Sequence, residues 1–325
     1  MITTLAIIVA VLGAGAVITF IGTRLIERAH RPRGRFIDIG GFPQHVVEMG
    51  PRDAHDTLPV AVLHGAGANL EDMHLALAEQ LAGRRRVIFV DRPGLGFSAR
   101  RAEEGASPAY QAAVLRDVLD RLGVERAIVV GHSWSGALAL TFALDFPARA
   151  AGLVLVAPAT HPGVWRMNKL NGLLAGPVGW LFARTLAFVF GAILMWPGSR
   201  TVFLPQTIPD RYVRRSAAML VLRPPTLMAN WADVGFLENF LERQVERYAT
   251  LTVPTIVLAG DRDPFVPAAR HGEKLAAAAP GVKLVVLPGF GHMLHHAAAD
   301  RVVEAVEEIA REANGNREPN SKLPN

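Results

Sequence analysis

Cysteine is absent from the 325-residue sequence. A chain without cysteine has no disulfide framework, no cysteine nucleophile and no thiolate ligands for a metal ion. This absence is compatible with either side of a membrane, so it does not indicate a compartment. Half of the residues are hydrophobic, which is enough for the core of one large domain with an insertion.

Charged side chains are missing from the segment Ile2–Gly22. About twenty apolar residues form a helix that can cross the hydrocarbon core of a bilayer. A cleaved signal peptide has basic residues before its apolar run, whereas Met1–Thr4 has none. We therefore predict an uncleaved transmembrane anchor over residues 1–23. A cleaved signal peptide and a buried helix of a soluble protein are the alternatives.

The formal charge is +5, and much of the excess follows the apolar segment, at Arg24, Arg28, Arg31, Arg33 and Arg35. Aromatic side chains are not interleaved with these arginines, so no nucleic-acid-binding module and no nucleic-acid partner are indicated. The basic flank of a transmembrane helix generally faces the cytoplasm. We predict a membrane protein with a single N-terminal pass, and with any catalytic domain in the cytoplasm.

Short apolar runs alternate with helical patterns along most of the chain. The predicted strands are Val60–Leu63, Val87–Val90, Ile128–Val130, Leu153–Val156, Thr255–Ala259 and Lys283–Leu287. The predicted helices between and after them are Met73–Leu81, Tyr110–Leu122, Ala268–Ala278 and Ala298–Ala310. Continuous apolar strands are typical of a parallel sheet that is buried on both faces. The pattern predicts an α/β fold with a doubly wound, mostly parallel sheet, and an antiparallel edge hairpin over Phe36–Met49.

The alternation of strands and helices stops between residues 159 and 248, where only helical and Pro/Gly-rich segments are found. We divide the chain into the anchor, a first core part over 24–158, a helical insertion over 159–248 and a second core part over 249–313. Residues 314–325 are polar with two prolines, which predicts a disordered tail.

A β-branched run passes directly into a helix-forming run in Ala127–Phe142, whose sequence is AIVVGHSWSGALALTF. Ser133 lies at the apex of the turn, an arrangement typical of a nucleophile elbow. The turn is so tight that the residues two positions before and after the serine must be small. They are Gly131 and Ser135, and Ser135 departs from the usual glycine. The simpler interpretation is a glycine-containing turn without a catalytic role.

The motif GHSWSG resembles the elbow of the α/β-hydrolase superfamily, and the resemblance extends from about Arg35 to Ile309. It implies an α/β-hydrolase fold whose insertion is a helical cap. It also implies a catalytic serine, acid and histidine in that chain order. The segment His64–Asn69, HGAGAN, lacks the Lys-Ser/Thr ending of a phosphate-binding loop.

Candidates for the acid and the base follow the last two predicted strands, at the edge of the sheet where Ser133 lies. GDRDPFVP resembles the acid loop of the family, in which the second acidic residue is functional, so Asp263 is favoured over Asp261. His292 lies in a glycine-flanked loop, as the family places its base. His295 and His296 are interpreted as structural or surface residues.

The resemblance also implies an oxyanion hole. One backbone N–H group would come from Trp134, after the nucleophile, and the second from Ala66 in the loop after an earlier strand. Asp91 and Arg92, in DRPGLGFS, are interpreted as structural. The Trp134 side chain either shapes an acyl pocket or packs under the cap.

We interpret the chain as a membrane-anchored serine hydrolase that cleaves carboxylic, lipophilic esters through an acyl-Ser133 intermediate. No metal or organic cofactor is implied. Carbon–carbon bond hydrolases and cofactor-free perhydrolases use the same three residues, and a non-catalytic ligand-binding protein on this fold is a further alternative. Leu173–Trp196 is unusually apolar, which indicates core-facing cap helices or a lid that dips into a membrane or admits lipid. Arg184 and the Gly/Pro interruptions argue against a second span.

Overall fold

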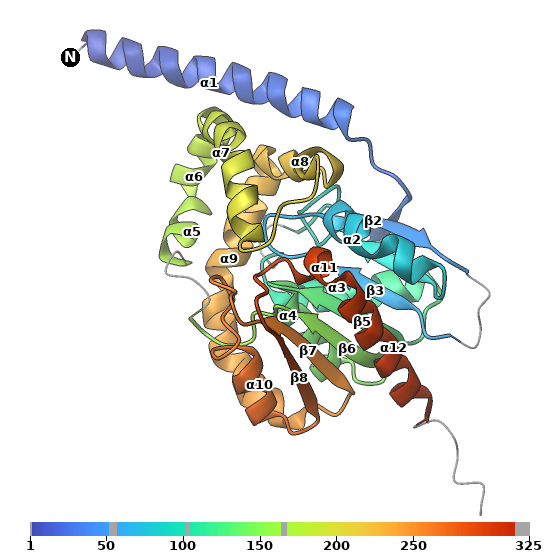
Figure 1. Cartoon of the computed structure of the whole chain (residues 1–325). Coiled ribbons are helices and arrows are strands. Elements are labelled where there is room, and N and C mark those ends of the chain that lie inside the picture. The colour runs from blue at the N-terminus through green and yellow to red at the C-terminus, as the bar shows by residue number, and fades with distance from the viewer. Residues whose placement is uncertain (1, 52–56, 102–103, 164–167, 316–325) are drawn as a thin grey trace, which may run out of the picture.

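The computed structural model describes residues 2–51, 57–101, 104–163 and 168–315. Eight strands form one sheet in the order β1-β2-β4-β3-β5-β6-β7-β8 (Figure 1). The strands are β1 (Arg35–Ile39), β2 (Phe42–Met49), β3 (Val60–Leu63), β4 (Val87–Val90), β5 (Ala127–His132), β6 (Ala150–Val156), β7 (Thr255–Gly260) and β8 (Val282–Leu287). The first two strands form the predicted antiparallel hairpin, β2 is antiparallel to β4, and every later pair is parallel. The prediction of a mostly parallel sheet is confirmed.

The described part of the chain contains fourteen helical segments. They are α1 (Ile2–Ala29), α2 (Leu70–Ala82), α3 (Pro108–Arg121), α4 (Ser135–Asp145), α5 (Asn168–Leu174), α6 (Pro177–Thr185), α7 (Ala187–Phe203), α8 (Tyr212–Arg215), η1 (Ala218–Leu222), α9 (Pro224–Gln244), η2 (Val245–Thr250), α10 (Gly272–Ala278), α11 (Leu294–Ala297) and α12 (Ala299–Gly315).

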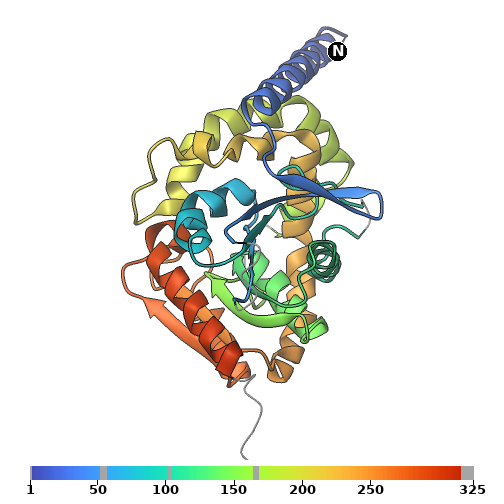
Figure 2. The same cartoon turned by 90° about the vertical axis from the view of Figure 1, so that its right-hand side faces the viewer.

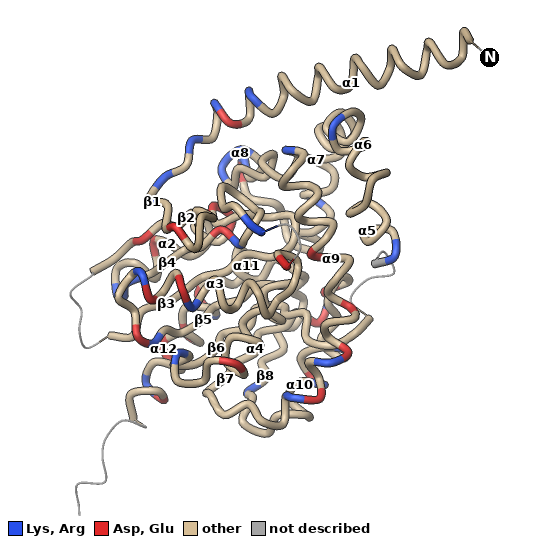
Figure 3. Tube along the Cα trace, turned by 180° about the vertical axis from the view of Figure 1, so that it is seen from behind, with Lys and Arg blue, Asp and Glu red and all other residues tan. Residues whose placement is uncertain are grey.

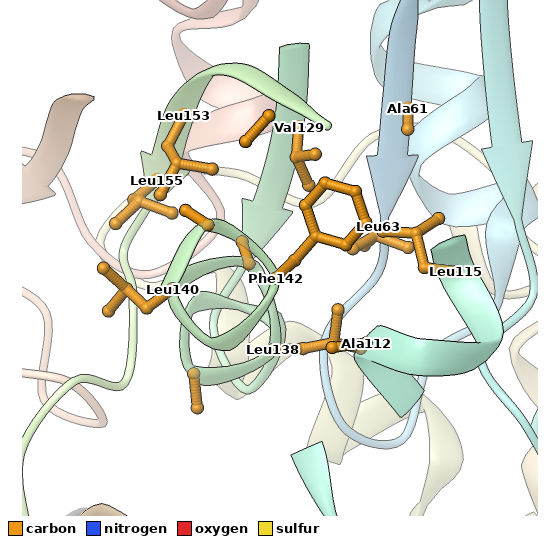
Figure 4. Close-up of a cluster of buried hydrophobic side chains, with 14 of the residues drawn as sticks. Ala61, Leu63, Ala112, Leu115, Val129, Leu138, Leu140, Phe142, Leu153 and Leu155 are labelled. Carbon is orange, nitrogen blue, oxygen red and sulfur yellow. The ribbon is translucent and has the colours of Figure 1, made fainter. Parts of the chain in front are cut away.

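Side chains of the central strands alternate between two apolar cores, one on each face of the sheet. Val129 contributes to the core that α3 and α4 cover, and Figure 4 shows it beside Phe142 of α4. Its neighbour Val130 contributes to the opposite core, which α2 and α12 cover. Both faces of the inner strands are therefore buried, which explains why these strands are continuously apolar in sequence.

Several helix ends differ from the sequence prediction, and a capping residue explains the start of α2. The α2 helix begins at Leu70 because the Asn69 side chain accepts a hydrogen bond from the Glu71 N–H. The α10 helix begins only at Gly272. The α12 helix continues to Gly315, so residues 314 and 315 are helical rather than part of the predicted tail. Residues 316–325 lie outside the described residues.

The helices α5 to α9 lie between β6 and β7 and cover the end of the sheet toward which the parallel strands run (Figure 2). We call this segment the cap. The N-terminal helix α1 lies across the outer side of the cap, away from the sheet (Figure 1).

The α1 helix is long and apolar enough to cross a membrane, and most of it is exposed. Its charged side chains gather toward its C-terminal end (Figure 3). A signal sequence has the same length and composition, so these properties fit both an anchor and a signal.

Candidate active site

Ser133 occupies a strained turn between β5 and α4. Its φ angle is +54°, in the left-handed region that side-chain-bearing residues rarely adopt. Three backbone hydrogen bonds hold it there. The Ser133 N–H donates to the Val156 carbonyl at 3.0 Å, and its own carbonyl accepts from the N–H groups of Gly136 and Ala159 at 2.8 and 2.9 Å. The turn thus presents the Ser133 side chain beyond the end of β5.

The small residues around Ser133 are required by close backbone contacts. A Cβ atom added to Gly131 would lie 2.6 Å from the carbonyl oxygen of Ser135. Ser135 itself is fully buried, and its hydroxyl donates a hydrogen bond of 2.5 Å to the His64 carbonyl. The serine that replaces the usual glycine is therefore accommodated with a hydrogen-bond partner.

The structure brings Ser133, His292 and Asp263 together. His292 Nε2 lies 3.0 Å from Ser133 Oγ, and its Nδ1 lies 2.7 Å from Asp263 Oδ2. Asp263 Oδ1 accepts hydrogen bonds from the N–H groups of Phe265 and Val266 at 2.8 and 2.9 Å. Burial opposes ionisation of Asp263, but His292 and these two N–H groups together hold its carboxyl pKa below the usual range. A carboxylate thus orients the imidazole, whose other nitrogen faces the serine hydroxyl.

Asp261, the rival candidate for the acid, accepts a hydrogen bond of 2.6 Å from the Gly289 N–H. This bond closes the turn that follows β8 and leaves Asp261 exposed, outside the group around Ser133.

The rival histidines lie in a second polar cluster that sequence reasoning missed. His295 and His296 donate to the two oxygens of Asp72 at 3.0 and 2.8 Å, and the Tyr212 hydroxyl donates to the same carboxylate at 2.9 Å. Burial opposes ionisation of Asp72, but the two histidines hold its pKa well below the usual range. His295 is fully buried, so the surface interpretation does not hold for it. The adjacent histidines of the sequence were the only signal that could have found this cluster.

The Asp72 cluster also has the residue types of a metal site. One ligand atom from each of Asp72, His295 and His296 lies within 4.8 Å of the other two, a set that could hold a divalent ion. Hydrogen bonds among these side chains account for the same geometry without an ion. The cluster links α2 and α11 of the core to α8 of the cap.

A cavity of about 590 Å³ lies between the cap and the ends of the strands. Ser133, His292, Trp134 and Ala66 line its floor, and most of its surface is apolar. The loop of Ala66 approaches the nucleophile closely, because a Cβ atom on the preceding Gly65 would lie 3.2 Å from Ser133 Cβ. The two backbone segments predicted to form an oxyanion hole therefore border the same space as the serine.

Arg92 has a fully buried side chain that hydrogen-bonds to the backbone of the loop that contains Ala66. It donates to the carbonyls of His64 and Gly65 at 3.1 and 3.2 Å, and forms an ion pair of 2.8 Å with Asp233 of α9. Its guanidinium lies 4.0 Å from the ring centroid of Trp134, whose indole N–H donates to the Asp233 carbonyl at 3.0 Å. Trp134 therefore both lines the cavity and packs under the cap.

His132, next to the nucleophile, is a further residue that the motif analysis did not single out. Its Nε2 lies 3.2 Å from the His292 carbonyl oxygen, and its ring lies 4.2 Å from that of His295, centroid to centroid. Burial lowers the pKa of His132 well below its usual value, so the ring is neutral and Nε2–H donates to His292. This bond fixes the loop that carries His292.

Comparisons with known proteins agree with this fold. Residues 59–299 match the family model described as alpha/beta hydrolase fold. The chain is 27% identical over 278 residues to the dihydrolipoyllysine-residue acetyltransferase component of an acetoin cleaving system from Pseudomonas putida, covering 85% of this chain and 69% of that protein. It is 25% identical over 272 residues to a 2-hydroxy-6-oxononadienedioate/2-hydroxy-6-oxononatrienedioate hydrolase from a Pseudomonas species, covering 81% and 89%.

A thermophilic esterase from Thermogutta terrifontis has a similar structure, with a TM-score of 0.68 and 24% identity over 86% of this chain and 99% of the esterase. At 24% identity, this similarity shows a shared fold and nothing more specific. Together with the family match, which spans most of the chain, it identifies the protein as a member of the α/β-hydrolase fold family.

Proposed function

We propose that this hydrolase cleaves carboxylic esters through an acyl-Ser133 intermediate. The observation that carries the proposal is the hydrogen-bonded line from Asp263 through His292 to Ser133 Oγ. As Oγ attacks the substrate carbonyl carbon, its proton passes to His292 Nε2. When the tetrahedral intermediate collapses, the carbon–oxygen bond to the alcohol breaks and the alcohol takes that proton. Water then repeats the sequence on the acyl-enzyme and releases the acid.

The negative charge of the tetrahedral intermediate needs preorganised N–H donors. The N–H groups of Ala66 and Trp134 are our candidates, because both residues line the cavity beside Ser133. Arg92 is a positioning residue in this proposal, since it holds the carbonyls of the two residues that precede Ala66.

A carbon–carbon bond hydrolase, which would use the same three residues, is the second candidate, because one relative is named as a hydrolase of 2-hydroxy-6-oxononadienedioate. The substrates in that name are dicarboxylates, which a site binds most favourably with basic side chains. The described residues that line the cavity include no lysine or arginine, and they include the acidic Asp72. The cavity therefore favours an apolar ester over a dicarboxylate.

We further propose that α1 anchors the protein in a membrane with the hydrolase domain on the cytoplasmic side. Length, composition and the exposure of α1 support the anchor. The arginines at its C-terminal end support the orientation.

The test is a comparison of the wild-type protein with Ser133→Ala, using a fluorophosphonate probe, a short-chain nitrophenyl ester and a vinylogous diketone. We expect the wild type to take up the probe and cleave the ester, and Ser133→Ala to do neither while its folding is unchanged. Preferred cleavage of the diketone would favour the carbon–carbon alternative, and ester-dependent formation of peracid from hydrogen peroxide would favour a perhydrolase. Absence of labelling in the folded wild type would favour a ligand-binding role.

A further inference from the structure

The outer surface of α6 and α7 is covered by large apolar side chains that no other part of the described chain covers. Trp180 and Leu181 of α6 are 51% and 47% exposed, and Phe190 and Ile193 of α7 are 52% and 68% exposed. Exposed apolar patches of this kind mark contact sites for membranes or other proteins. The sequence interpretation of core-facing cap helices therefore fails for these residues.

The two helices have the geometry of a re-entrant element. Neither helix alone is long enough to span a membrane, but together they are long and apolar enough, and they bend by 74° at the break between them. Arg184 is the only charged residue from Pro177 to Ser199. Its guanidinium lies over the Trp180 ring at 4.3 Å and donates to the Trp180 carbonyl, so the charge stays close to its own helix.

The break between α6 and α7 rests directly on the apolar part of α1. The Thr19 hydroxyl donates to the Thr185 carbonyl at 2.9 Å. A Cβ atom on Gly15 would lie 2.7 Å from that same oxygen, and one on Gly22 would meet the Phe188 ring. The small residues of α1 are therefore required for this close contact.

This contact fixes the depth of the cap if α1 crosses a bilayer. Gly15 and Gly22 both belong to the uncharged segment of α1 and are separated by about 10 Å along the helix, at 1.5 Å per residue. The bend at Thr185 touches this part of α1, so it would lie inside the hydrocarbon layer.

Basic side chains lie where the protein would emerge from the hydrocarbon layer into the headgroup region. His30, just after α1, borders the same hollow as Arg211 and Arg214 of the cap and as Trp196. In Figure 3 the basic end of α1 and the arginines of α8 lie on the same side of the molecule. Arginine and tryptophan are the side chains typical of the headgroup region.

One residue of α7 borders both the cavity and the exposed apolar surface of the cap. Leu194 lines the cavity and is also 59% exposed, next to Ile193. A molecule that enters beside Leu194 would therefore come from the surface that carries Trp180, Leu181 and Phe190.

We propose that α6 and α7 form a re-entrant element that is embedded in the lipid bilayer beside α1. We propose also that the active-site cavity opens into the bilayer at Leu194, so that the substrate is an amphiphilic ester resident in the membrane. The first statement stands on the apolar surface and its contact with α1, and the second rests on the proposed ester hydrolysis.

The insertion is tested with the full chain, in which the absence of cysteine allows single labelling sites. Ile193→Cys and Lys274→Cys, the latter exposed on α10 of the core, are labelled with an environment-sensitive fluorophore. Both proteins are reconstituted in phosphatidylcholine–phosphatidylglycerol vesicles that contain lipids with nitroxides at known acyl positions. We expect acyl-chain nitroxides to quench the label at position 193 and not that at position 274. Equal, weak quenching at both positions would overturn the embedded cap.

The entry route is tested with Leu181→Glu/Ile193→Glu, because neither residue lines the cavity, and with Val286→Glu on the outer strand β8 as the matched control. We expect the double variant to lose about tenfold or more of its activity on a long-chain ester dispersed in vesicles, because charged side chains oppose insertion of the cap. Its activity on a water-soluble short ester should change less than about twofold. Equal losses on both substrates, or no loss on either, would refute entry from the bilayer. Quenching at position 193 in a protein without esterase activity would refute the proposed function and leave the embedded cap standing.

Discussion

The hydroxyl of Ser135 donates a hydrogen bond of 2.5 Å to the carbonyl oxygen of His64. This bond turns the second serine of the elbow away from the cavity and ties it to the strand end that leads into the Ala66 loop. Ser135→Ala should therefore keep fluorophosphonate labelling, because Ser133 is unchanged. It should lower the free energy of unfolding by about 1 kcal/mol through the lost hydrogen bond. Urea denaturation and probe labelling of the same preparation measure both effects, and loss of labelling in a folded variant would contradict this assignment.

Asp263→Asn should lower the rate of ester hydrolysis by orders of magnitude. An amide can occupy the same space, but it favours the wrong tautomer of His292, and a loss of about ten-thousand-fold is known for the equivalent change in another triad. The measurement is kcat/KM with a soluble ester, supported by a denaturation curve that shows an intact fold.

Asp261→Asn is the matched control, because the Asp261 side chain lies in the same loop as Asp263 but accepts its hydrogen bond from the Gly289 N–H. Its effect on kcat/KM should be mild. If the two variants rank in the opposite order, the acid of the triad has been misassigned.

Folding stability should fall as the pH decreases from about 6.5 toward 4. Burial, together with nearby positive charge, lowers the pKa of His64 and of His271 to about 4. Between pH 4 and about 6.5, these histidines bind protons in the unfolded chain but not in the folded protein. The folding stability therefore rises with pH in this window and is lost on acidification. Each such histidine contributes about 1.4 kcal/mol per pH unit within this window. Urea denaturation at several pH values gives the slope.

The variant His271→Asn measures how much one of these histidines contributes to the pH dependence of stability. His271 Nδ1 accepts from the N–H groups of Thr160 and His161, and an asparagine oxygen can do the same without titrating. In this variant, the slope of the free energy of unfolding against pH should decrease by the contribution of about one bound proton. An unchanged slope would mean that His271 does not remain neutral in the folded protein.

The sequence was sufficient for the features that depend on local pattern. Continuous apolar strands, the tight turn around Ser133 and the order of Ser133, Asp263 and His292 are all visible in the chain, and the structure brings these three residues together. Helix ends were less accurate, because side-chain caps such as that of Asn69 decide them.

Contacts between distant segments could not be predicted from pattern. Asp72 meets His295 across more than two hundred residues, and Arg92 meets Asp233 of the cap. From its sequence alone, the apolar stretch of α6 and α7 could be either buried or exposed. Only the exposure of the Trp180 and Ile193 side chains in the structure shows that they face outward.

Deletion of residues 2–22 should release the protein from membranes only in part. The truncation removes the predicted span but leaves the apolar side chains of the cap, and it also uncovers Thr185 and Phe188. Hydrolysis of a soluble short-chain ester should persist, because Ser133, Asp263 and His292 lie outside the deleted segment. Carbonate extraction of membranes, followed by activity measurements on the soluble and membrane fractions, distinguishes partial from complete release. Complete solubility of the truncated protein would show that the cap has no membrane affinity of its own.

Longer acyl chains should be preferred over short ones, up to the length that the cavity accepts. The cavity is mostly apolar, and each buried methylene contributes about 0.8 kcal/mol, or about fourfold in kcat/KM if the contact persists in the transition state. Val234→Phe, which places a larger side chain in the lining contributed by α9, should abolish the advantage of long chains and leave short esters nearly unaffected. The measurement is kcat/KM for a series from acetate to dodecanoate with both proteins, in detergent below its critical concentration. A wild-type protein that prefers acetate over octanoate would show that the cavity does not bind the acyl chain.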